Sequence, residues 1–500
     1  IDDKWFASQR GMTLTANPPV KAERVFVPEK PWESSRISLA PTILEDGGIY
    51  KMWYRCSAPG SKETAPHAWS MICYAVSDDG LHWERQNVNL FEWEGITENN
   101  ILMPGAHGGV TIDPNGPDEH RYKALIRVVE NDVWPESKGA VFTRHEGRMW
   151  SELYLATSPD GIRWQRQEPS ALPFFHDTNN QLFFDARLGK YTAYVRTHAR
   201  KRTVGRVEFD DPMDLPWPYR DNPEGPRGPG RTRREAGGAI AIALTCDESD
   251  PPDTDLYTPC VHPYPWAADA YFAFPSPYRH YAVGEVSLKP GDPPDPTLKG
   301  PLGDERGVYS NSGPVEVQVA VSRDGVVFSR PDRRPYVSLG LVGSWDGGQT
   351  YMGLGMVRKG DEIWQYYHGT KRLHGVKDSG SADGDGAICR LVQRLDGFVS
   401  ADADYTGAEF TTPLLEFSGS RLQLNADCSA TGEIWVEVRD DRNVPVPGYT
   451  MEDSVSVDRN QTAAPVVWRE RKDVAELVGR PVRLHFKLRA CKLYAYQFAG

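Results

Sequence analysis

The chain has 500 residues with a formal net charge of −12, and it contains 46 Gly, 40 Pro, 15 Trp and 22 Tyr. This acidic balance disfavours nucleic acid as a partner, because binding phosphates requires a basic face. No apolar run reaches the roughly 18 residues needed to cross a bilayer as a helix, so we expect no membrane span.

A short hairpin motif returns three times, with the pattern Ser-x-Asp-Gly-apolar-x-aromatic. The copies lie at 77–83, 158–164 and 322–328, each after a strand-like run. Asp-Gly suits a tight turn, since Gly accepts positive φ and Asp bonds its own backbone. The second gap is about twice the first, which predicts an intervening unit without the motif. Such regular return is typical of a repeat architecture.

Short runs rich in Val, Ile, Tyr and Phe, separated by Gly, Pro, Asp and Asn, predict an all-β protein. They group into five units about 80 residues apart, with strands at 37–45, 50–55 and 71–76; 110–113, 121–129 and 152–157; 181–185, 190–196 and 202–209; 257–262, 270–275, 278–286 and 315–321; and 350–358, 362–367 and 387–395. This spacing favours a five-bladed β-propeller, whose radial closure protects strand edges. A pair of β-sandwiches is the alternative.

Three segments fall outside these units. Residues 1–30 form a lead-in with one strand at 23–27, and 211–256 form a Pro- and Gly-rich insertion. The insertion carries Arg227, Arg231, Arg233 and Arg234, which form either a solvated loop or a lip for an anionic or sulfated ligand. Alternating runs at 417–426, 432–439, 464–469, 480–488 and 493–498 predict a C-terminal β-sandwich. We therefore expect a propeller over 1–405 and a sandwich over 406–500.

The seven cysteines form no CxxC pair, and no HExxH is present, so we predict no metal or other cofactor. Cys56 could pair with Cys73, and Cys428 with Cys491, or all could be buried free thiols. The odd count leaves at least one thiol free.

A propeller gathers the starts of its innermost strands at one axial mouth. Counting back from each first turn selects most of the candidate catalytic and sugar-binding residues, to which Arg196, at the end of a predicted strand, and His262 are added. The candidate catalytic carboxylates are Asp177, Asp346, Glu33 and Asp255. The candidate binding residues are His107, Arg36, Arg196, Tyr257, Trp345 and His262. Sugar hydrolysis needs one carboxyl group held protonated and a second held ionised, which this set could supply.

Each of the carboxylates also has a plainer interpretation. Asp177 and Asp346 lie in turn-like contexts and could cap turns, Asp255 lies in an acidic loop, and Glu33 could only pair with Arg36. The Asp residues of the three hairpin motifs are interpreted as turn residues far from the chemistry.

The three Asp-Gly hairpins, the five-unit spacing and the trailing sandwich resemble the five-bladed β-propeller glycoside hydrolases, a superfamily of invertase-like, arabinanase-like and mannoside-phosphorylase-like enzymes. The resemblance implies three acidic residues on inner strands. The invertase-like Asn-Asp-Pro-Asn-Gly, Arg-Asp-Pro and Glu-Cys motifs are not present. Asp113-Pro-Asn-Gly116 falls at a first-hairpin turn, so no nucleophile is transferred to it.

Our hypothesis from the sequence is a secreted or periplasmic glycoside hydrolase that cleaves a plant or algal oligo- or polysaccharide. One alternative is a non-catalytic, lectin-like propeller. Another is a polysaccharide lyase in which Arg196 neutralises a uronic acid carboxylate.

Overall fold

The computed structural model describes residues 2–58, 71–104, 108–127, 152–174, 176–177, 179–199, 201–220, 239–281, 312–375 and 384–500. Within these ranges the chain is all-β with antiparallel sheets, and its helical segments are four 3₁₀ turns: η1 (Asp3–Trp5), η2 (Pro31–Glu33), η3 (Asp118–His120) and η4 (Ala475–Leu477). None of these short helical segments could span a membrane.

Five sheets follow one another along the chain. The first contains β4 (Arg36–Asp46), β5 (Ile49–Ser57), β6 (Met71–Ser77) and β7 (Ile101–Pro104). The second contains β8 (Val110–Ile112), β9 (Tyr122–Arg127), β10 (Leu153–Ser158) and β11 (Gln165–Arg166). The third contains β12 (Gln181–Asp185), β13 (Lys190–Ala199), β14 (Lys201–Phe209) and β15 (Ala241–Leu244).

The fourth sheet contains β17 (Val261–Pro263), β18 (Tyr271–Ala273) and β20 (Ala320–Ser322). Beside it, β16 (Thr254–Leu256) pairs with β19 (Pro277–Arg279). The fifth sheet contains β21 (Gln349–Met352), β23 (Glu362–Thr370) and β24 (Ala387–Arg394), with β22 (Val357–Lys359) on β23. Its outer strand is β3 (Val20–Phe26), from the start of the chain.

The first three sheets have four strands each, and all five arise from short apolar strands that alternate with turns. Central strands are buried on both faces, as in β10, where all six residues are buried. The first strand of each sheet lies at its edge. These edge strands contact one another in a closed series, through the pairs Val110 N to Thr42 Oγ1 (3.3 Å), Gly109 N to Asn180 O (3.2 Å), Val261 N to Gln181 Oε1 (2.7 Å), Cys260 Sγ to Gly353 O (3.3 Å) and Leu354 N to Pro41 O (2.8 Å).

The three sequence motifs form one turn geometry. In the first copy, Ser77 Oγ accepts the Gly80 amide at 2.9 Å, and Asp79 Oδ1 accepts the next two amides at 2.8 Å. The other copies repeat these bonds, and the motif glycines have φ between +68° and +77°. In Asp79, Asp160 and Asp324, Oδ1 therefore accepts hydrogen bonds from the turn backbone.

Each motif turn also contacts the preceding sheet. Trp53 in β5 donates its indole N–H to the carbonyl of Gly161 at 2.7 Å. Tyr366 in β23 donates to Gly80 O at 2.9 Å, and Tyr194 in β13 donates to Gly325 O. The motif thus joins neighbouring sheets. The third sheet lacks the motif, and it accounts for the doubled gap in the sequence.

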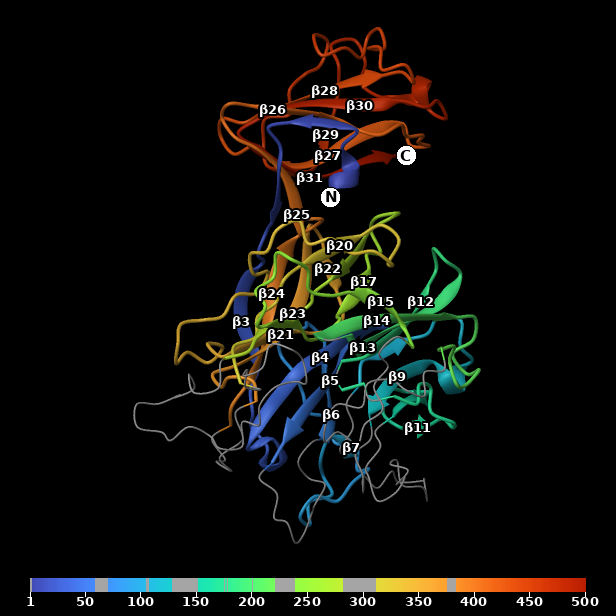
Figure 1. Ribbon diagram of the computed structural model, residues 1–500, viewed down its shortest axis with the longest axis vertical. Coiled ribbons are helices and arrows are strands. Elements are labelled where there is room, and N and C mark those ends of the chain that lie inside the picture. The colour runs from blue at the N-terminus through green and yellow to red at the C-terminus, as the bar shows by residue number, and fades with distance from the viewer. Residues whose placement is uncertain are drawn as a thin grey trace.

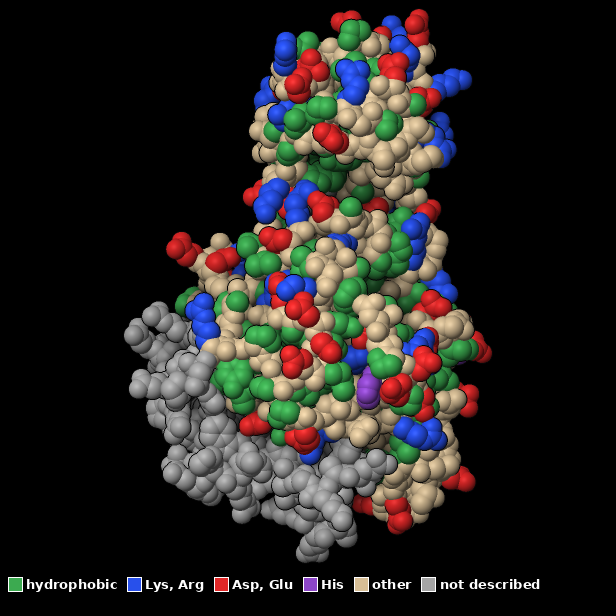
Figure 2. Space-filling model, turned by 90° about the vertical axis from the view of Figure 1, so that its right-hand side faces the viewer, with side chains coloured by type: hydrophobic (Ala, Val, Ile, Leu, Met, Phe, Trp, Pro, Cys, Tyr) green, Lys and Arg blue, Asp and Glu red, His purple; other side chains and the backbone are tan. Residues whose placement is uncertain are grey.

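The C-terminal strands form two further sheets at one end of the molecule (Figure 1). One contains β1 (Ser8–Arg10), β26 (Ala408–Thr411), β30 (Arg483–Arg489) and β28 (Glu433–Arg439). The other contains β2 (Thr13–Ala16), β25 (Val399–Ala403), β31 (Cys491–Ala499), β27 (Arg421–Asp427) and β29 (Gln461–Pro465). Apolar side chains such as Phe410, Leu424 and Phe486 form one buried cluster between them. Figure 2 shows acidic and basic side chains interspersed over the surface of this end.

The strand pairing differs from the sequence prediction in the lead-in, near residue 405 and in the predicted insertion. β1 and β2 lie in the predicted lead-in, yet they complete the C-terminal sheets, and β25 begins before residue 406. β15 lies within the segment interpreted as an insertion, and it is the fourth strand of the third sheet. The arginines at 227–234 lie outside the described residues.

The cysteines are free thiols. Cys56 and Cys73 lie on neighbouring strands with their sulfur atoms 3.4 Å apart. Burial raises the pKa of the Cys73 thiol well above its usual range, so this thiol is an inert core group in the structure.

Candidate functional site

Polar and aromatic side chains converge beside the starts of the edge strands. They come from segments far apart in the sequence and contact one another in one group. We call this group the central cluster; its members are Arg36, Asp177, Arg196, Arg202, Asp255, Tyr257, Tyr278, His280, Tyr351, His368 and His374. Four of the residues predicted from the sequence, Asp177, Arg196, Asp255 and Tyr257, are thereby brought together, and Arg36 joins them through its charge on Tyr351.

Asp177 is the accessible carboxylate of the central cluster. Arg196 in β13 donates Nη1 to Asp177 Oδ2, and the Tyr257 hydroxyl donates to the same oxygen at 3.4 Å. The Arg196 guanidinium also lies 5.0 Å from the centroid of the Tyr257 ring. Asp177 keeps 25% of its side chain exposed, whereas Arg196 keeps 4%. A ligand can therefore reach this carboxylate, which is held in place by a buried partner.

Asp255 has the opposite environment. Its Oδ2 accepts from Arg202 Nη1 at 2.7 Å and from His280 Nε2 at 3.0 Å, and 1% of the side chain is exposed. Burial by itself would raise the pKa of Asp255, but the His280 hydrogen bond and the Arg202 charge hold it well below its usual range. Asp255 is therefore ionised at any ordinary pH and cannot act as a proton donor.

Three tyrosines fill the space between these charges. The Tyr257 ring centroid lies 6.0 Å from that of Tyr278 and 5.9 Å from that of Tyr351. Burial raises the pKa values of Tyr278 and Tyr351 well above their usual range. Their hydroxyls stay protonated, and His374 packs on Tyr278 with ring centroids 4.4 Å apart.

Arg36 is the first residue of β4. The carbonyl of the next residue, Ile37, accepts a hydrogen bond from His368 Nε2 at 2.8 Å, and the His368 ring stacks on Tyr351 with centroids 6.2 Å apart, so the start of β4 lies beside these rings. Burial lowers the pKa of His368 to about 4, and the Arg36 charge acts in the same direction, so His368 is neutral near pH 7.

Several buried polar atoms at this place have no hydrogen-bond partner among the described residues: Arg36 Nε, His176 Nε2, Asp255 Oδ1 and His368 Nδ1. Buried polar groups are almost always paired in native proteins. A group of orphaned donors and acceptors around one accessible carboxylate therefore indicates a site completed by a polar ligand or by water.

Glu33 is placed differently. Its carboxylate accepts from Arg85 Nε at 2.8 Å, from the Tyr54 hydroxyl at 2.5 Å and from the backbone amides of Glu29 and Lys30. The side chain is fully buried. These donors, and not Arg36, hydrogen-bond the Glu33 carboxylate, so its contacts favour a structural role.

Asp346 and Trp345 lie over the outer strands of the fifth sheet. Asp346 accepts from Lys21 in β3 at 2.7 Å and from the Tyr367 hydroxyl at 3.0 Å. Trp345 packs on Tyr367 with ring centroids 5.8 Å apart. Neither makes a described contact with Asp177 or Tyr257, so the structure does not bring them into the central cluster.

The two remaining predicted residues are histidines. His262 in β17 lies against Cys260 and Phe274, and burial lowers its pKa to about 4, so it is a neutral side chain between the sheets. His107 lies outside the described residues, and its predicted role in binding stays a prediction.

The sequence reasoning did not select Arg202, Tyr278, His280, Tyr351, His368 and His374. Arg202 and Tyr278 are the first residues of the predicted strands 202–209 and 278–286, whereas most candidates precede the first turn of a unit. The starts of the third strands would have added these two residues.

Glu316 was also missed. Burial raises its pKa, which is the property expected of a general acid. Its neighbour Val315 packs among the central tyrosines, so Glu316 faces the other side of this extended segment.

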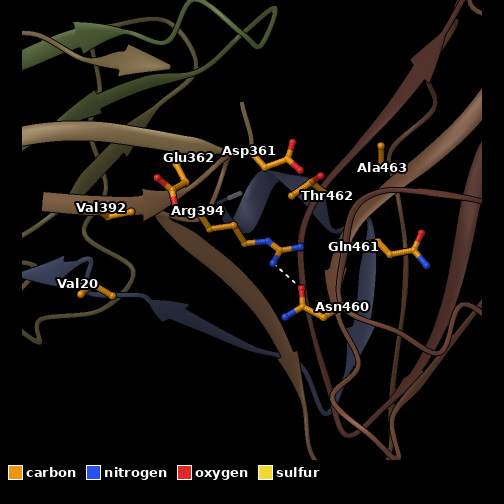
Figure 3. Close-up of a pocket in the computed structure, with 9 residues that line it drawn as sticks. All are labelled: Val20, Asp361, Glu362, Val392, Arg394, Asn460, Gln461, Thr462 and Ala463. Atoms are coloured by element: carbon orange, nitrogen blue, oxygen red, sulfur yellow. Dashed lines mark hydrogen bonds between the residues drawn. The ribbon is translucent and has the colours of Figure 1, made fainter. Parts of the chain in front are cut away.

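No group of three or more His, Cys, Asp or Glu side chains in the described ranges is placed to hold a metal ion. A separate open cavity of about 730 Å³ lies between the fifth sheet and β29, lined by Val20, Asp361, Glu362, Val392, Arg394 and residues 460–463. Figure 3 shows Arg394 reaching across it to Asn460 Oδ1, at 2.5 Å. Arg394 Nε also donates to Asn425 Oδ1 at 2.7 Å, so Arg394 links the fifth sheet to the C-terminal sheets at this cavity, which we call the seam. None of the residues that line it belongs to the central cluster.

No family model matches the chain. Over 131 residues it is 29% identical to the uncharacterized protein MT1551 of Mycobacterium tuberculosis (strain CDC 1551 / Oshkosh), and equally to the uncharacterized protein Rv1502 of strain ATCC 25618 / H37Rv. The match covers 25% of this chain and spans a third of the length of those proteins.

Solved structures that resemble the chain include glycoside hydrolases. A putative glycoside hydrolase from Bacteroides ovatus ATCC 8483 has 15% identity and a TM-score of 0.43, covering 75% of this chain and 97% of that one. A structure described under the GH130 family of mannoside phosphorylases, which contains glycoside hydrolases that target β-1,2 mannosidic linkages in Candida mannan, has 16% identity and a TM-score of 0.41, covering 80% and 98%.

Proposed function

We propose that the five consecutive sheets are the blades of a five-bladed β-propeller, that the two C-terminal sheets form a β-sandwich, and that the central cluster is the active site of a glycoside hydrolase. The closed series of edge-strand contacts supports the propeller, because it returns from the fifth sheet to the first through Leu354 and Pro41. A secreted or periplasmic location, and a plant or algal saccharide as substrate, are part of this proposal.

The observation that carries the function is the environment of Asp177. It is a carboxylate that is accessible, ion-paired to a buried arginine and bonded to Tyr257, in a cluster that holds two further tyrosines and several orphaned polar atoms. Tyrosine faces stack on sugar rings, and hydroxyl and guanidinium groups bond sugar hydroxyls. A carboxylate fixed in this setting suits attack on, or activation of water toward, an anomeric carbon.

In the proposed reaction, Asp177 removes a proton from water as the water oxygen bonds to the anomeric carbon, or it bonds that carbon itself. The glycosidic carbon–oxygen bond breaks, and the leaving oxygen takes a proton from solvent, to which Asp177 returns the proton it removed. In the covalent route, water then displaces Asp177 from the anomeric carbon and releases its proton to solvent. Arg196 pairs with Asp177 and orients it for this role.

Asp255, being buried and ionised, balances the charge of Arg202 and bonds His280. The Arg202 guanidinium lies against Tyr257 and Tyr278, which with Tyr351 form what we call the tyrosine wall.

The test compares the variant Asp177→Asn with Asp402→Asn. Asp402 is a matched control, because it has a similar exposure and its own ion pair, with Lys492 at 2.6 Å, in the C-terminal sheets. We expect Asp177→Asn to lower turnover by roughly 100-fold or more, since general acid–base groups contribute about that much, while Asp402→Asn keeps parental turnover. The measurement is release of reducing ends from a panel of neutral, sulfated and uronic oligosaccharides, with thermal unfolding as a check on folding.

Parental activity in Asp177→Asn would remove the assignment of this residue. A lyase is the second candidate, because Tyr257 lies beside Asp177 and between Arg196 and Arg202, an arrangement that could remove a proton next to a neutralised carboxylate. Ultraviolet absorbance of an unsaturated uronate in the same panel would identify that reaction. Saccharide binding without any product would identify a lectin.

A further inference from the structure

The central cluster holds more arginines than carboxylates can neutralise. Arg196 pairs with Asp177, Arg202 pairs with Asp255 at 2.7 Å, and nearby Arg372 pairs with Asp385 at 3.1 Å. Arg36 has no carboxylate partner among the described residues. Among the residues that the structure describes, one guanidinium of this site therefore has no compensating carboxylate.

The backbone places Arg36 at the site. Arg36 is the first residue of β4, where it opposes Ser57 of β5 and forms a parallel bridge to Asp385. The amide of Ile37 donates to Asp385 O at 3.0 Å, which holds this strand start against the fifth sheet. The side chain is partly exposed. The carbonyl of the next residue, Ile37, accepts a hydrogen bond from His368 Nε2 at 2.8 Å, and the His368 ring stacks on Tyr351 with centroids 6.2 Å apart, so Arg36 lies beside the same tyrosines as Asp177.

The state of the Arg36 side chain points to an anion. Its Nε is buried and has no acceptor among the described residues. A guanidinium is always charged and presents a planar fork that matches a carboxylate or a sulfate ester. The nearby His368 is neutral near pH 7 and adds no negative charge that could satisfy it. Among the described residues, the site therefore lacks a negatively charged hydrogen-bond acceptor for the Arg36 guanidinium.

We propose that the substrate is an acidic sugar, whose carboxylate or sulfate ester binds Arg36 while its glycosidic bond lies at Asp177. This proposal rests on the function proposed above and adds the substrate class to it. Arg36 is then the residue that selects charged over neutral sugars.

The experiment measures binding by isothermal titration, with the full chain carrying Asp177→Asn so that no substrate is consumed. The probes are a uronic acid oligosaccharide with its carboxyl-reduced counterpart, and a sulfated oligosaccharide with its desulfated counterpart. We expect one acidic member to bind about tenfold or more tightly than its neutral counterpart, and added salt to weaken that preference. A difference within the uronic acid pair would identify a carboxylate as the bound group, and a difference within the sulfated pair would identify a sulfate ester.

Adding Arg36→Met should abolish the preference, and Arg36→Lys should restore part of it, since lysine keeps the charge without the fork. Arg358→Met, at an exposed arginine of the fifth sheet, serves as the control and should keep the preference. Equal binding of acidic and neutral members by the parent, or an unchanged preference in Arg36→Met, would overturn the inference. Turnover of a neutral oligosaccharide in the reducing-end assay would then still support the hydrolase.

Discussion

At the scale of single residues, the environment separates side chains that the sequence presents alike. Asp177, Asp255 and Glu33 are three acidic residues near predicted strand starts. The first is accessible, the second is buried against Arg202 and His280, and the third is enclosed by Arg85 and Tyr54. Their different prospects for chemistry come from these partners, since an ionised group needs access to react and a buried charge needs compensation to exist.

Buried histidines predict how stability depends on pH. Burial lowers the pKa values of His176, His262 and His368 from 6.5 to about 4. Between these values only the unfolded chain binds the proton, so the free energy of unfolding should fall as the pH drops from about 6.5 to 4, by up to about 3 kcal/mol for each histidine. Urea unfolding at a series of pH values measures this slope.

The variant His262→Gln isolates one of these groups, since glutamine does not titrate. Its free energy of unfolding should depend less on pH over the same interval. A slope identical to that of the parent would show that His262 does not stay neutral in the folded chain.

At the scale of elements, the repeated motif acts as a joint between sheets. The sequence predicted a tight turn, and the turn bonds confirm that local geometry. The partner of each turn was not predictable, because Trp53, Tyr194 and Tyr366 lie on the second strand of another sheet. Only the arrangement of the sheets brings that aromatic to the glycine carbonyl.

Two glycines with positive φ test this joint. A Cβ on Gly161 (φ +77°) would lie 2.7 Å from the Trp53 ring, whereas one on Gly189 (φ +64°) meets nothing within 4 Å. Both Gly161→Ala and Gly189→Ala should lose about 1 kcal/mol from backbone strain. Gly161→Ala should lose at least about 1 kcal/mol more, because the indole must shift in a packed core. Chemical denaturation measures both, and equal losses would refute a tight contact at the joint.

At the scale of the whole molecule, the two ends of the chain share sheets. β1 and β2 complete the C-terminal sheets, while β3 closes the fifth sheet. Arg394 adds a side-chain link across the seam, bonding Asn425 and Asn460 (Figure 3). These links predict that the two parts unfold together.

The variant Arg394→Met should weaken this coupling and separate the calorimetric transition into two components. Arg390→Met is the matched control, because Arg390 lies on the same strand but pairs with Glu23 inside the fifth sheet. It should lower the transition temperature without splitting the transition. A single transition in Arg394→Met would show that the shared strands alone couple the two parts.

The sequence by itself determined the elements that depend on local chemistry. Alternating apolar runs and Asp-Gly turns predicted most strands and the all-β class, and the doubled gap between motifs predicted the unit without one. It also pointed to Asp177, Arg196, Asp255 and Tyr257, because strand starts recur at regular intervals.

Only the tertiary structure decided which of those residues contact one another and how exposed, paired or buried each side chain is. Exposure, ion pairing and burial arise from segments hundreds of residues apart, and no local pattern records them. The fourth strand of the third sheet, β15, was missed for the same reason: four residues become a strand when a sheet edge is there to pair with them. Arg36 likewise became informative only when the structure showed the other arginines of the site paired and this one without a partner among the described residues.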